Sequence, residues 1–110
     1  MSLDADTIYR DITAAGEDWA DKKAAYECLD DMTKTIYSDI LTDYLPPTCQ
    51  TKAEAETRAY ASAKYKEHLA AKSKARRDWL LAEVKWKNLN LLAELRRSQE
   101  STRRAEMGMR

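Results

Sequence analysis

The sequence contains little that would break a helix or span a membrane. Among its 110 residues there are two glycines, two adjacent prolines and no phenylalanine. It has no run of about 18 apolar residues, so no segment is expected to cross a membrane. Its N-terminal stretch begins acidic and lacks an apolar segment, so we expect no secretory signal.

Residues that carry chemistry are also scarce. Cys28 and Cys49 are too few for a disulfide framework and lack the spacing of a metal site, so a reducing cytoplasm is the expected compartment. The lone histidine, His68, has no set of ligand residues at suitable spacing and is expected on a solvated helix face. There is no glycine-rich phosphate loop and no nucleophile elbow. The sequence therefore predicts no enzyme, no cofactor and no metal ion.

What the sequence does contain is typical of long helices. Charged residues make up 35% of it, and Ala, Glu, Lys, Leu and Arg are plentiful. Residues 1–50 carry eleven acids and four bases, a charge of −7, whereas residues 51–110 carry eight acids and fifteen bases, a charge of +7. This asymmetry favours two halves that neutralise each other as antiparallel neighbours over a dedicated nucleic-acid surface.

An apolar heptad repeat predicts a first helix over about residues 4–45. Positions 8, 15, 22, 29 and 36 form one series and positions 12, 19, 26, 33 and 40 another, and eight of these ten residues are apolar or aromatic. This spacing places them on one face, where they can pack against another helix. Asp4 is the expected N-cap, and Gly16 is tolerated at a cost of about 1 kcal/mol relative to alanine.

A turn at 46–51 is predicted to separate this helix from a second one. Pro46 and Pro47 end the first helix, because proline cannot continue it. Thr51 and Glu54 then form a capping box, in which the threonine oxygen accepts from a first-turn amide and the glutamate returns to the threonine amide.

The second helix is expected over about residues 52–104, with a frayed tail at 105–110 and the whole chain in one domain. Helices joined by a connection this short are antiparallel neighbours, and the fold pairs residues whose numbers sum to about 97. Trp19 then faces Trp79. The predicted fold class is all-α: a long antiparallel two-helix, coiled-coil-like hairpin that associates into an oligomeric bundle.

The oligomer is predicted from a second apolar stripe on the second helix. Residues 79–95 are apolar on two opposite faces, and a two-helix hairpin can bury only one of them. The face that meets the first helix contains Trp79, Ala82, Trp86, Leu89 and Ala93. The second stripe, the predicted oligomer interface, contains Leu81, Val84, Leu91, Leu92 and Leu95. A homodimer with a four-helix core around 79–95 is the first expectation.

Arginines of the second helix are candidate contacts for a protein partner or nucleic acid. They are Arg76, Arg77, Arg96, Arg97, Arg103 and Arg104. Lysine and arginine at helical spacing can follow a phosphate backbone, although interspersed acidic residues weaken that interpretation. The alternative is a charged flank that solvates the end of a helix and interacts with its dipole.

The second half of the chain resembles small helical proteins encoded by tailed phages and prophages. Their pattern is a turn with A-E-x-x-A, a Y-K-E-x-L-like segment and a long charged helix with an arginine-rich end. The matching segments are Ala53-Glu54, Tyr65-Lys66-Glu67-His68-Leu69 and the stretch from Leu92 to Met107. Genes of this group tend to lie among phage recombination and replication genes. The resemblance implies an accessory protein of phage DNA metabolism in the cytoplasm of a bacterial host cell.

Two functions from different classes remain open. The first is a non-enzymatic accessory of recombination or replication, a coiled-coil scaffold or adaptor that holds a protein partner, with or without contact to single-stranded DNA. The second is an inhibitor of a host nuclease or defence enzyme, in which the acidic first helix replaces nucleic-acid phosphates. Binding to DNA that weakens with salt would favour the first, and competition with DNA for an enzyme would favour the second.

Overall fold

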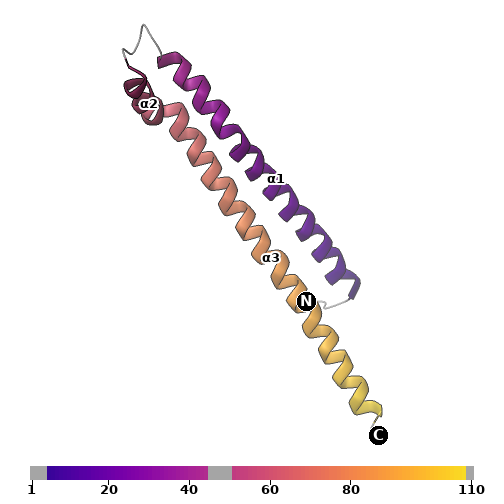
Figure 1. The fold of residues 1–110 in the computed structure, drawn as a ribbon. Coiled ribbons are helices and arrows are strands. Elements are labelled where there is room, and N and C mark those ends of the chain that lie inside the picture. The colour runs from indigo at the N-terminus through magenta and orange to yellow at the C-terminus, as the bar shows by residue number, and fades with distance from the viewer. Residues whose placement is uncertain (1–4, 45–50, 109–110) are drawn as a thin grey trace. The chain divides into compact units, whose positions relative to one another are not determined.

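The computed structural model describes residues 5–44 and 51–108, and these form three helices and no strand. The helices are α1 (Ala5–Tyr44), α2 (Lys52–Ala61) and α3 (Ala63–Gly108) (Figure 1). The all-α prediction is therefore confirmed for the described residues, and their order is compatible with a helical hairpin. The predicted roles of Asp4, Cys49 and the two prolines lie outside the described residues.

The chain divides into two compact units. One contains residues 22–78, which are the second half of α1, all of α2 and the first part of α3. The other contains residues 1–21 and 79–110, which are the first part of α1 and the rest of α3. That the whole chain behaves as a single domain stays a prediction.

Helix α2 begins at the predicted cap. Thr51 has an extended backbone, and its Oγ1 accepts a hydrogen bond from the amide of Glu54 at 3.1 Å. The Thr51 carbonyl accepts from the amide of Ala55 at 3.1 Å, which starts the helical ladder. The Glu54 carboxylate pairs with Arg58 one turn later, at 3.2 Å. The threonine half of the capping box is thus present as predicted.

The continuous second helix expected over 52–104 is interrupted at Ser62. This residue has a ψ of 148°, which takes the chain out of the helical region, and it is the C-cap of α2. Its Oγ also accepts from the amide of Tyr65 at 3.2 Å, as an N-cap of α3 does. One serine therefore satisfies backbone groups of both helices, and α2 runs at an angle to the start of α3 (Figure 1).

The interruption changes the pairing in the unit of residues 22–78. Tyr37 meets Tyr60 of α2, with ring centroids 4.7 Å apart, as the predicted register requires. Beyond Ser62, Thr33 lies beside His68, although the predicted register placed it opposite position 64. Because α2 is angled to α3, each residue of α2 carries the chain a shorter distance along α1 than a residue of a straight helix would.

The unit of residues 1–21 and 79–110 has a small apolar core. Ile8 and Ala15 of α1 and Ala82 and Ala93 of α3 are buried. Trp19 stacks on Trp86 with centroids 5.0 Å apart and planes inclined by 23°.

This pairing is also later than predicted, because Trp19 was expected opposite Trp79. The stack on Trp86 lies seven positions further along the chain. At its C-terminal end, α3 continues to Gly108, whereas the sequence predicted that the helix ends at about residue 104 and is followed by a frayed tail. The last residues of the helix are exposed, so its backbone ladder and not side-chain packing holds this end.

Candidate interaction surface

The apolar stripe predicted to form an oligomer interface is exposed. Leu81, Val84, Leu91 and Leu95, which we name the α3 stripe, have exposed fractions between 55% and 61%. On the same helix, Ala82 and Ala93 are buried toward α1. The sequence therefore located both faces of this part of α3.

Two other leucines differ from the sequence-based interpretation. Leu92, predicted as part of the interface, is half-buried and lies between the two faces of α3. Leu80 was not predicted as an interface residue but is exposed and lies beside the α3 stripe. The sequence did not indicate it because it falls one position before Leu81, the first residue of the predicted stripe.

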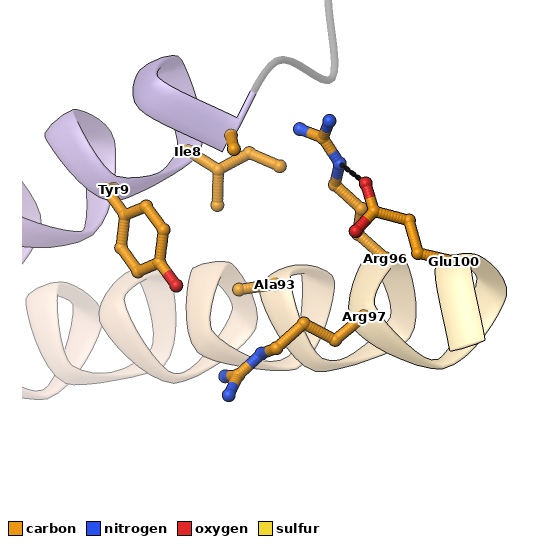
Figure 2. A pocket seen from close by; sticks show the side chains of 7 residues that line it. Ile8, Tyr9, Ala93, Arg96, Arg97 and Glu100 are labelled. Atoms are coloured by element: carbon orange, nitrogen blue, oxygen red, sulfur yellow. Dashed lines mark ion pairs between the residues drawn. The ribbon is translucent and has the colours of Figure 1, made fainter. Parts of the chain in front are cut away.

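Two of the predicted arginines line a small hollow with residues of α1. Ile8 and Tyr9 of α1 face Ala93, Arg96 and Glu100 of α3, and Arg97 completes the wall (Figure 2). The hollow has a volume of about 90 Å³, well below the roughly 300 Å³ of a small-molecule site. It is therefore a feature of a surface and not a cofactor pocket.

Arg96 is held in place more firmly than the sequence indicated. The Nε of Arg96 lies 3.4 Å from a Glu100 oxygen one turn away, and its side chain packs beside Ile8 (Figure 2). Its Nη1 is buried and has no hydrogen-bond partner among the described residues.

The remaining predicted arginines fall in both units. Arg76 and Arg77 are exposed in the unit of residues 22–78. Arg97, Arg103 and Arg104 are exposed in the other unit, on the end of α3. Only Arg96 and Arg97 are brought together around one described hollow.

His68 contradicts the expectation of a solvated histidine. It is buried, and its Nε2 lies 2.9 Å from Oγ1 of Thr33. The Thr33 hydroxyl donates its single proton to the carbonyl of Leu29 at 3.1 Å, so it accepts from the histidine ring. The proton of neutral His68 is therefore assigned to Nε2. The sequence feature that could have indicated a buried partner for His68 is Thr33, a polar residue within the apolar heptad series of the first helix.

An ion pair lies one helical turn further along the same interface. Nζ of Lys72 on α3 is 2.6 Å from a carboxylate oxygen of Asp30 on α1. This hydrogen bond raises the pKa of Lys72, and partial burial opposes the change. Lys72 and Asp30 are the kind of contact between helices that the opposite charges of the two sequence halves predicted.

A cluster of three tyrosines packs where α1 meets α2 and the start of α3. Tyr37 contacts Tyr60 and also Tyr65, whose ring centroid is 5.8 Å away in an edge arrangement. Burial, a hydrogen bond with Tyr60 and the nearby Glu56 carboxylate raise the pKa of Tyr37 to about 12. This cluster packs residues from both sides of the Ser62 break against one residue of α1. We interpret it as a structural contact and not as a binding site.

The described parts of the chain contain neither a metal-binding cluster nor a helix suited to a membrane. Within residues 5–44 and 51–108, no three side chains of histidine, cysteine, aspartate or glutamate come together as a metal site requires. No helix in these ranges is long and apolar enough to cross a membrane. In comparisons with known proteins, no family model matches the chain, and no curated protein or solved structure matches it significantly.

Proposed function

We propose that this chain is a non-enzymatic scaffold or adaptor that self-associates through the α3 stripe and presents arginines at the end of α3 to a partner. The observation that carries this proposal is the exposure of four large aliphatic side chains at helical spacing on the face of α3 opposite its buried alanines. Contiguous apolar surface of this kind marks interaction sites in soluble proteins.

Burial of the α3 stripe supplies a driving force for association. Complete burial of a leucine stabilises by about 1.5–3 kcal/mol, and these side chains are already about half-buried. Covering their exposed parts in two copies therefore contributes several such increments. Association also costs translational and side-chain freedom, so the expected self-association is of moderate affinity.

The arginines at the end of α3 are the proposed contact for a partner. Arg97, Arg103 and Arg104 are exposed, and the half-buried Arg96, which pairs with Glu100, lies beside Arg97 on the same helix. Guanidinium groups bind carboxylates and phosphates in a planar, bidentate manner, so the partner carries acidic side chains or a nucleic-acid backbone. The resemblance of residues 51–110 to phage proteins supports our proposal that this adaptor acts in recombination or replication of phage DNA.

Self-association is tested with a charged double variant. Leu91→Lys with Leu95→Lys should lower the mass measured by equilibrium sedimentation, because each lysine would have to bury its charge in the interface. A matched control adds the same charges at exposed alanines of α1, as Ala20→Lys with Ala24→Lys, and should keep the wild-type mass. A wild-type protein that stays monomeric at tens of micromolar would overturn the scaffold proposal.

The partner surface is tested separately. Replacement of Arg96, Arg97, Arg103 and Arg104 by glutamine should reduce recovery of co-purifying proteins from phage-infected cells, or reduce binding of single-stranded DNA. Binding to DNA should weaken as salt rises, because phosphate contacts release counterions. Unchanged recovery and unchanged DNA binding would reject the arginine surface. If the wild type instead competes with DNA for a nuclease, the inhibitor function is favoured.

A further inference from the structure

A polar residue, Asn88, lies at the centre of the face of α3 that carries the α3 stripe. Leu81, Val84, Asn88, Leu91 and Leu95 follow one another at spacings of three, four, three and four residues, which is the spacing of a two-stranded coiled-coil seam. Asn88 is exposed like its four apolar neighbours. Arg77 precedes this series and Ser98 follows it, so the apolar seam is confined to 81–95.

We propose that the α3 stripe binds a second copy of this chain in parallel and in register, with Asn88 of one copy paired to Asn88 of the other. This inference rests on the proposed self-association and adds its direction and its register. In this arrangement each apolar residue of the stripe faces its own counterpart. The two Asn88 amides can each donate to and accept from the other, which satisfies polar groups that the interface removes from water.

An antiparallel arrangement leaves Asn88 without such a partner. The spacings read three, four, three, four in one direction and four, three, four, three in the other. Two reversed helices therefore pair four of the five seam positions only when Asn88 faces Val84 or when it faces Leu91. A primary amide buried against an aliphatic side chain loses its hydrogen bonds to water and gains none, which destabilises that arrangement. A single asparagine in a seam thereby selects the register.

The charges beside the seam agree with the parallel arrangement. In parallel, Lys87 lies beside Leu92 of the second copy, and Lys85 lies beside Leu80, so no like charges meet. The reversed alignment that pairs Asn88 with Val84 brings Lys85 beside Lys85 of the second copy and Lys87 beside Lys87 of the second copy. These like charges repel each other. The other reversed alignment places Lys87 beside Glu94, so there the unpaired Asn88 is the decisive cost.

The position of α1 decides which helices form the interface. Ala82 and Ala93, on the opposite side of α3 from the stripe, are buried toward α1. Two copies therefore meet through α3 alone, with each α1 on the outer side. This proposal replaces the four-helix core expected from the sequence with a two-stranded one.

The test is a cross-link at Ser98, the next seam position after Leu95. In a background with Cys28→Ser and Cys49→Ser, the full chain carrying Ser98→Cys is oxidised under mild conditions. In a parallel dimer the two introduced thiols face each other. In either antiparallel alignment they are at least 17 residues apart along the helix, about 25 Å, and cannot join. Arg104→Cys, exposed on another face of α3, is the control for collisions.

The expected result is a covalent dimer from the Ser98→Cys chain that forms about tenfold faster than from the Arg104→Cys chain, as an effective-concentration gain requires. Asn88→Leu should strengthen association in sedimentation and lower the fraction cross-linked at position 98, because the reversed alignments no longer bury an amide. A dimer by sedimentation that gives no faster cross-link at position 98 would overturn the direction and register but keep the scaffold proposal. A monomer would overturn both.

Discussion

A methyl group at Gly16 would lie 3.2 Å from Nε1 of Trp86, closer than ordinary van der Waals contact. The Trp86 ring is itself stacked on Trp19, so it has little freedom to withdraw. The sequence alone indicated that Gly16 only costs helix stability. In the structure this glycine lets the α3 indole approach the backbone of α1.

Gly16→Ala should therefore give no gain in the free energy of unfolding, or a loss, although alanine favours a helix by about 1 kcal/mol over glycine. The same change in a Trp86→Leu background should recover that gain, because the contact is gone. Urea unfolding followed by circular dichroism measures both values. Equal stabilisation in the two backgrounds would show that the indole does not require the glycine.

Thr33→Val should destabilise the protein by about 1–3 kcal/mol, since it leaves the buried Nε2–H of His68 without its acceptor. Thr33→Ser keeps the hydroxyl oxygen and should lose much less. The measurement is the free energy of unfolding of each variant near neutral pH. If valine and serine have the same effect, the hydrogen bond contributes nothing beyond the shape of the side chain.

Ser62→Ala should cost about 1 kcal/mol, the usual loss when an N-cap is removed, because the amide of Tyr65 loses its acceptor. Ser62→Asp keeps a capping oxygen and is the matched control. The tyrosine cluster should still hold the break, so helix content should not rise. Higher helicity together with higher stability in the alanine variant would mean that the serine alone interrupts an otherwise continuous helix.

Alkaline pH should weaken the unit of residues 22–78. The folded pKa of Tyr37 is raised to about 12 from 10.0, so the fold favours the protonated phenol. Its contribution is fully present below pH 10 and is lost as the pH rises toward 12. The pKa of Lys72 is also raised above 10.5, so its contribution to stability is likewise lost as the pH rises into the alkaline range.

The expected measurement is a melting temperature that falls between pH 10 and pH 12, with the tyrosinate absorbance that is lost in Tyr37→Phe appearing late in the titration. Tyr37→Phe should flatten this fall, because phenylalanine has no proton to lose. Tyr60→Phe should move the Tyr37 titration toward lower pH by removing its hydrogen-bond partner. An identical pH profile for wild type and Tyr37→Phe would refute the contribution of this tyrosine.

The features that the sequence determined by itself are local or periodic. The scarcity of glycine and proline allows long helices. Thr51 caps α2 because a side chain three residues from an amide can reach it without any tertiary contact. The α3 stripe could also be predicted from the sequence, since apolar residues at helical spacing share a face of the helix regardless of its surroundings. Its exposure followed from having more apolar surface on this helix than one neighbour can cover.

Tertiary structure decided what depends on which residues meet across the helices. At the break at Ser62, tyrosines from both sides of it pack on Tyr37, and these contacts depend on a residue far away in the sequence. The break shifts the pairing, so His68 meets Thr33 and is buried where its own neighbours predicted a solvated face. Trp19 stacks on Trp86 for a related reason, because helical periodicity repeats every turn and leaves the register between two helices open until their side chains pack.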